Sequence, residues 1–153
     1  MHAAEAEGVE VRRVFSATPE RLFDAWTRPE VIKRWNTRPG VTVPVAEVDL
    51  RVGGRYRLHL CGPDGTVHRV EGVYRVVEPP VRLSYTWVAE IDATRAESVV
   101  TVDFRECPGG TQVTLRHEHL PTRDSRRRHA SGWSACLAQL DQVITDDERG
   151  RNH

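Results

Sequence analysis

Short runs of alternating polar and apolar residues, separated by glycine and proline, restrict the fold of this chain more than any other feature. They are densest over residues 49–87, where the turns contain Gly53-Gly54, Pro63-Asp64-Gly65 and Pro79-Pro80. Alternation between tight turns is typical of strands joined into an antiparallel sheet with one buried face. The pattern predicts strands over residues 9–15, 41–49, 54–61, 67–78, 82–89, 97–106 and 111–119. Because proline cannot donate to a strand ladder, Pro44 should place its strand at the sheet edge or in a bulge.

Two short helices should follow the first strand. Thr18 can cap the first helix, and Pro19 stands where a missing N–H costs nothing. Pro29 opens the second helix, which should end before Pro39.

A long amphipathic helix is predicted from about residue 124 to residue 145. Its apolar residues recur at spacings of four, three and four: Trp133, Leu137, Leu140 and Ile144. At 1.5 Å per residue, such a helix reaches roughly 33 Å, which is enough to cross the sheet. We expect one domain over residues 9–145, with flexible polar tails over residues 1–8 and 146–153.

The charge balance and the cysteines bear on partners and location. Lys+Arg and Asp+Glu number 22 each, whereas nucleic acid or an anionic membrane surface usually requires a basic excess. No apolar run approaches the roughly 20 residues that span a bilayer, and the first eight residues lack the features of a signal peptide. The cysteines are odd in number and far apart, which favours a reducing cytoplasm over a disulfide framework. We therefore expect a cytoplasmic protein without a nucleic-acid partner or membrane insertion.

Particular motifs add to this pattern of elements. They include Arg13-Val14-Phe15-x-Ala17, Trp26 with Pro29-Glu30 and Trp35, Asp49-x-Arg51-x-Gly53-Gly54, Glu71-Gly72-x-Tyr74, Pro79-Pro80-x-Arg82-Leu83 and Gly132-Trp133. With them, the chain resembles the AHSA-type family, the homologues of the heat-shock-protein-90 ATPase activator, over about residues 9–145. This family is a branch of the START-like (SRPBCC, Bet v-type) helix-grip superfamily. The resemblance implies an α+β fold in which a curved antiparallel sheet of about seven strands is covered by the long C-terminal helix.

Helix-grip proteins mostly bind lipids or polyketides, so the resemblance implies a pocket between the sheet and the C-terminal helix. Its expected lining consists of inward side chains of the strands and of the long helix: Tyr56, Leu58, Tyr74, Tyr85, Trp87, Val100, Phe104, Leu115, His117, Trp133 and Leu137. The expected ligand is a small hydrophobic or aromatic molecule, oriented by His117 and the tyrosine hydroxyls. One alternative is a cyclase-like or aromatase-like enzyme in which His117 is the acid or base. Another is a protein that binds a chaperone partner, and a homodimer stays open.

We predict no metal ion and no cofactor. His117 and His119 share a strand face, but no carboxylate or thiol stands at ligand spacing near them. A triad of Ser98, His117 and Asp103 is disfavoured, because residues 98 and 103 point to opposite faces of one strand. His117 is therefore expected either as a polar group in the pocket or, by default, as a structural histidine bonded to the backbone.

Overall fold

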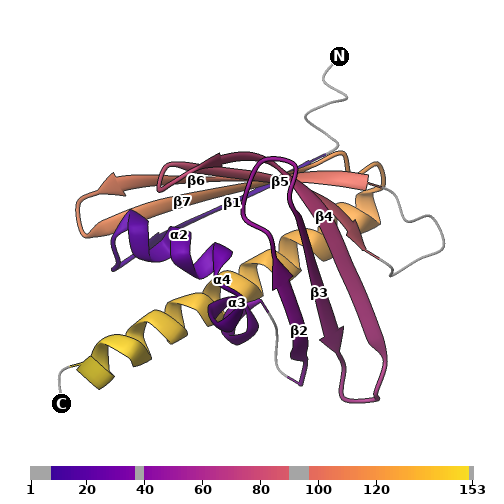
Figure 1. Ribbon diagram of the computed structural model, residues 1–153, viewed down its shortest axis with the longest axis horizontal. Coiled ribbons are helices and arrows are strands. Elements are labelled where there is room, and N and C mark those ends of the chain that lie inside the picture. Colours follow the sequence, from indigo (N-terminus) through magenta and orange to yellow (C-terminus); the bar gives the residue numbers. More distant parts are fainter. Residues whose placement is uncertain (1–7, 37–39, 90–96, 152–153) are drawn as a thin grey trace.

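A seven-stranded antiparallel sheet and three helices make up the described part of the chain (Figure 1). The computed structural model describes residues 8–36, 40–89 and 97–151. Its elements are β1 (Val9–Phe15), α2 (Pro19–Thr27), α3 (Pro29–Trp35), β2 (Thr42–Val48), β3 (Arg55–Cys61), β4 (Val67–Glu78), β5 (Arg82–Ala89), β6 (Glu97–Cys107), β7 (Gly110–Glu118) and α4 (Arg123–Arg151). The strands lie in the order β1-β7-β6-β5-β4-β3-β2, and α4 crosses beneath the curved sheet. The predicted α+β helix-grip fold is confirmed.

The capping residue, the edge-strand proline and the turn glycine occupy the positions that the sequence predicted for them. Thr18 caps α2, because its hydroxyl oxygen accepts a hydrogen bond from the Arg21 N–H at 3.2 Å. The strand with Pro44 is β2, at the edge of the sheet, and its pairing with β3 is irregular between Thr42 and Val45. Both expectations for this proline are confirmed. Gly53, in the turn before β3, has a φ of +85°, a left-handed conformation that glycine adopts without strain.

β4 and β5 approach closely at Gly72, and their pairing shifts register between Tyr74 and Val76. A Cβ on Gly72 would lie 1.9 Å from the Thr86 carbonyl oxygen, so only glycine fits. That oxygen accepts a hydrogen bond from the Tyr56 hydroxyl at 2.6 Å, and the Thr86 hydroxyl accepts one from the Val73 N–H at 2.8 Å. The contact holds the Tyr56 side chain across the buried side of the sheet.

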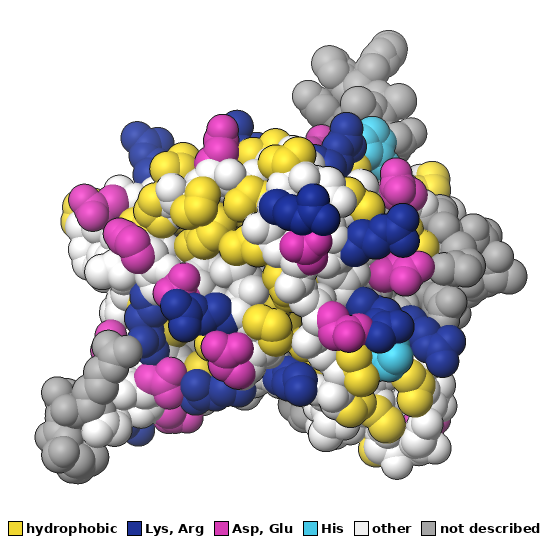
Figure 2. Space-filling model, in the orientation of Figure 1, with side chains coloured by type: hydrophobic (Ala, Val, Ile, Leu, Met, Phe, Trp, Pro, Cys, Tyr) yellow, Lys and Arg dark blue, Asp and Glu magenta, His cyan; other side chains and the backbone are white. Residues whose placement is uncertain are grey.

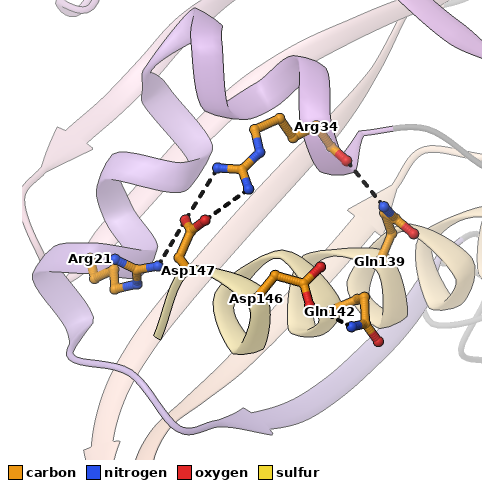
Figure 3. Close-up of polar contacts among 6 residues, drawn as sticks. All are labelled: Arg21, Arg34, Gln139, Gln142, Asp146 and Asp147. Carbon is orange, nitrogen blue, oxygen red and sulfur yellow. Dashed lines mark hydrogen bonds and ion pairs between the residues drawn. The ribbon is translucent and has the colours of Figure 1, made fainter. Parts of the chain in front are cut away.

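The prediction that residues 146–153 form a flexible tail is wrong for residues 146–151, because α4 continues to Arg151. Asp147 pairs with Arg34 through two hydrogen bonds, of 2.8 and 3.2 Å, and with Arg21 at 3.1 Å (Figure 3). These bonds connect the last turns of α4 to α2 and α3. Hydrophobic periodicity could not show this, since the extension is held by charge rather than by an apolar stripe. Of the expected tail over residues 1–8, residues 1–7 lie outside the described part, as do residues 152–153.

The core lies between the sheet and the helices. The apolar stripe of α4 packs into it, and Trp133, Leu137, Leu140 and Ile144 are all buried.

On the face shown in Figure 2, Lys/Arg and Asp/Glu side chains are interspersed rather than gathered by sign. Within the described ranges, no helix is both long and apolar enough to cross a membrane.

Candidate functional site

A cavity of about 20 Å³ lies where α2 and α3 meet strands β2 to β5. Its wall consists of Trp26, Ile32, Asn36, Val48, Tyr56, Leu58, Tyr74, Tyr85 and Trp87. Two larger hollows, of about 730 and 550 Å³, open on the surface, and of the eleven predicted residues only Tyr56 lines either of them. The small cavity is therefore where the predicted site residues gather.

The structure brings five of those residues to the cavity: Tyr56, Leu58, Tyr74, Tyr85 and Trp87. The other six are buried but do not line it: Val100, Phe104, Leu115, His117, Trp133 and Leu137. The cavity is displaced from the position expected beneath α4, because its lining from the helices is Trp26 of α2 and Ile32 of α3, and it includes no residue of α4. The residues missed were Trp26, Ile32, Asn36 and Val48. The sequence predicted the short helices and the strand on which three of them lie, but not that these elements meet at one cavity.

Three tyrosines from three adjacent strands form one side of the cavity. The ring centroids of Tyr56 and Tyr85 are 5.2 Å apart, and those of Tyr56 and Tyr74 are 5.6 Å apart. Tyr74 and Tyr85 complete the cluster at 6.0 Å, edge to face. Burial raises the pKa of all three hydroxyls, so they are uncharged donors at neutral pH.

Two tryptophans contribute indole N–H groups to the same region. The Nε1 atoms of Trp26 and Trp87 are buried and have no hydrogen-bond partner within the described structure. The ring of Trp26 packs against Trp35 at 4.5 Å and Phe104 at 5.5 Å. A buried donor left unpaired costs about 1–3 kcal/mol, so an acceptor placed beside it is stabilising.

Tyr85 lies near the first of these indoles. Burial raises the pKa of its hydroxyl, and the Trp26 indole lowers the same pKa by a smaller amount. The Trp26 N–H has no hydrogen-bond partner among the described residues.

His117 is fully buried in a separate chain of hydrogen bonds. Its Nδ1 accepts from the Trp133 indole N–H at 3.0 Å, and its Nε2 lies 2.7 Å from the Ser98 hydroxyl. Since Nδ1 is an acceptor, a neutral ring carries its proton on Nε2 and donates it to Ser98. The Ser98 hydroxyl in turn donates to the Trp87 carbonyl at 3.1 Å. The partners of His117 are thus side chains, and the expected bonding to the backbone is wrong.

This arrangement is unsuited to proton transfer from Ser98. The Nε2 of His117 already holds a proton, and burial lowers the pKa of the ring to about 3, with a smaller contribution from His129. Asp103 lies on the other face of β6, bound to Arg82 at 2.6 Å, so it cannot orient the imidazole. We interpret His117 as a neutral structural link between α4 and the sheet.

Metal-binding side chains do not gather at one place in the described part of the chain. Among residues 8–36, 40–89 and 97–151, no three His, Cys, Asp or Glu side chains are grouped so that they could hold a metal ion. His119 lies just beyond β7, is exposed and has a φ of 67°, whereas His117 is fully buried. The two histidines therefore do not form a pair.

Comparison with known proteins identifies related chains. The family described as Activator of Hsp90 ATPase homolog 1-like protein matches residues 16–145. A protein of Chromobacterium violaceum is 26% identical, with a TM-score of 0.85 over 91% of this chain and 97% of its own. The AHSA1 protein of Silicibacter pomeroyi is also 26% identical, with a TM-score of 0.82 over 92% and 99%. An AHSA1-like protein of Aeromonas hydrophila is 26% identical, with a TM-score of 0.77 over 92% and 94%. No curated protein matches significantly.

Proposed function

Since this chain belongs to the family of Activator of Hsp90 ATPase homolog 1-like proteins, whose fold supports a ligand-binding or activator-type role, we propose that it binds a small aromatic molecule at the cavity under α3. The observation that carries the proposal is the composition of the cavity wall, in which three tyrosines and two tryptophans surround a space between a helix and a sheet. Apolar walls with a few convergent polar groups are typical of small-molecule sites. The cytoplasm is the location that we propose.

The cavity must widen to admit a ligand. At about 20 Å³ it has room for roughly one water molecule, whereas a dry cavity of about 150 Å³ admits benzene. Most of its wall belongs to strands held by their ladders, so the movable part is α3, which contributes Ile32 and is followed by Asn36. This helix has seven residues, and its ion pair with Asp147 is partly exposed. A pair of this kind contributes only about 0–1 kcal/mol.

The free energies of opening the cavity, burying the ligand and association together restrict the chemistry of the ligand. Opening roughly 130 Å³ costs about 3 kcal/mol at about 24 cal/mol per Å³. Burying about 300 Å² of apolar ligand surface gains roughly 7–8 kcal/mol, and association takes back at least about 4 kcal/mol. The balance is close to zero, so apolar contact alone supports only very weak binding. Polar contacts with the cavity wall are needed for useful affinity.

The test is a titration of ¹⁵N-labelled protein with naphthalene, read from backbone amide shifts. We expect shifts that saturate and that concentrate around α3 and strands β3 to β5. Val48→Phe places a ring at the cavity wall and should abolish the shifts. Val14→Phe is the matched control, because Val14 is 54% exposed on β1 and does not line the cavity. No saturable shifts up to the solubility limit, or equal shifts in both variants, would refute the proposal.

The family description favours one competing function, the activation of a chaperone ATPase. The two functions can be separated with Val48→Phe, because a ring that fills the cavity should prevent ligand binding but should not affect an activity that depends on the protein surface. If the chain stimulates a heat-shock-protein-90 ATPase, and Val48→Phe stimulates it equally, the activity belongs to a surface rather than to the cavity.

A further inference from the structure

We propose that the ligand of the cavity under α3 is an uncharged planar aromatic molecule whose hydrogen-bond acceptor, a ring nitrogen or a carbonyl oxygen, binds the indole N–H of Trp87 or Trp26. The proposal deepens the proposed function and rests on it. Its geometric basis is that both tryptophans line one cavity and that both of their nitrogen atoms are buried without a partner in the described part of the chain.

Both rings pack against other aromatic side chains, and neither N–H has a hydrogen-bond partner among the described residues. Trp26 is 4% exposed, and its ring packs between Trp35 and Phe104. The ring of Trp87 packs against Trp133 at 5.2 Å and against His117 at 5.6 Å. An indole N–H can only donate, so the complementary ligand atom must be an acceptor. Because the Trp26 N–H also faces Tyr85, Trp87 is the stronger candidate.

The wall also specifies the charge of the ligand. None of the nine lining residues is Lys, Arg, Asp or Glu. An ionised carboxylate or ammonium group would enter this space without a counterion and without water, which is strongly unfavourable. The tyrosine rings offer edges and faces to a flat partner, which suits an aromatic ring better than a branched or flexible chain.

The experiment compares naphthalene with quinoline, two bicyclic probes of nearly equal size that differ in one ring nitrogen. Affinity for each is measured by amide shifts in the wild-type protein and in Trp87→Phe and Trp26→Phe. The ratio of the two affinities is compared between proteins, so differences in hydration of the probes cancel. We expect at least one tryptophan variant to lose quinoline affinity relative to naphthalene by about threefold to tenfold, the worth of one neutral hydrogen bond. Tyr74→Phe, which removes a hydroxyl from the same wall, tests whether a hydroxyl rather than an indole is the donor.

A second readout does not depend on the variants being stable. The four tryptophans give four indole N–H signals in ¹⁵N-labelled protein, and quinoline should move the Trp87 or Trp26 signal downfield while naphthalene does not. If both probes bind but neither indole signal distinguishes them, and the ratio stays within twofold in both tryptophan variants, the inference is wrong and the proposed function stands. Loss of the ratio in Tyr74→Phe alone would show that the Tyr74 hydroxyl, and not an indole, donates to the ring nitrogen of the ligand, and would also overturn the inference. Binding of neither probe would refute the proposed function itself.

Discussion

The indole N–H of Trp133 on α4 donates to Nδ1 of His117 on β7 across the interface between the helix and the sheet, at 3.0 Å. This bond determines the tautomer, because Nδ1 must stay unprotonated to accept it. Protonation of His117 would place two N–H groups against each other in a buried site. The neutral state of His117 is therefore part of the attachment of α4 to the sheet.

Folding stability should fall on acidification because of His117. Its pKa is about 3 in the folded chain and about 6.5 when unfolded, so the unfolded chain binds the extra proton between these values. The contribution is complete above about pH 6.5 and is lost as the pH falls toward 3. The free energy of unfolding should decrease by about 1.4 kcal/mol per pH unit, or roughly 2 kcal/mol at pH 5. Urea denaturation at pH 5.0, 5.5, 6.0, 6.5 and 7.0 measures it.

Two variants identify the histidine responsible for the dependence of the unfolding free energy on pH. His117→Asn should flatten it, apart from a smaller part from His129, whose pKa burial also lowers. His119→Asn should keep the wild-type slope, because His119 is exposed, and asparagine tolerates its positive φ. Equal slopes in the two variants would show that His117 is not the group responsible.

Gly72 and Gly132 should respond to alanine with opposite signs. The new Cβ at position 72 would meet the Thr86 carbonyl at 1.9 Å, so β4 and β5 must separate, and we expect a loss of about 3 kcal/mol. Gly132 lies inside α4 with nothing within 4 Å of its Cβ position, and alanine there should add about 0.5–1 kcal/mol. Urea midpoints of both variants test the pair. A neutral Gly72→Ala would mean that the strand contact is readily relaxed.

Sequence patterns predicted the sheet well, for a physical reason. Each strand has a buried and an exposed face, so the alternation predicts both that a segment is a strand and which of its side chains face the core. Tyr56, Tyr74 and Tyr85 are examples of such inward side chains. The end of α4 escaped prediction because Asp147 pairs with Arg34 and Arg21, residues more than 100 positions away. Pairings over that separation leave no local periodicity.

The candidate site was predictable only in part, because it depends on which helix covers which strands. The sheet side of the cavity was expected, but Ile32 and Asn36 reach it through the tertiary position of α3. A tryptophan in a sequence indicates a core position, and Trp26 is indeed in the core. That its N–H has no acceptor among the described residues is visible only in the folded structure, where its neighbours are in place.

Asp147→Asn should weaken the attachment of α4 to the short helices. It removes the charge that pairs with Arg34 and Arg21, and we expect a loss of about 1 kcal/mol at low salt that shrinks at high salt. Hydrogen bonding from Arg34 lowers the pKa of Asp147, so its contribution is present above about pH 4 and is lost as the pH falls through the lower folded value. Asp146→Asn is the control, because Asp146 bonds to Gln142 within α4 (Figure 3). Urea denaturation of both variants at two salt concentrations tests this prediction. Equal losses of stability in the two variants would argue against a contribution from the ion pair.

Ile32→Ala should trade stability for affinity at the cavity. Ile32 is 5% exposed and lines the cavity from α3, so its truncation enlarges the space before any ligand arrives. The cost of opening then falls on folding, with an expected loss of about 2–4 kcal/mol, rather than on binding. Affinity for naphthalene should rise by about tenfold to a hundredfold, since up to about 3 kcal/mol no longer opposes binding. Leu22→Ala is the matched control, because Leu22 is fully buried in α2 but does not line the cavity. It should lose similar stability without gaining affinity, and a gain in both variants would indicate general loosening of the core instead of a site under α3.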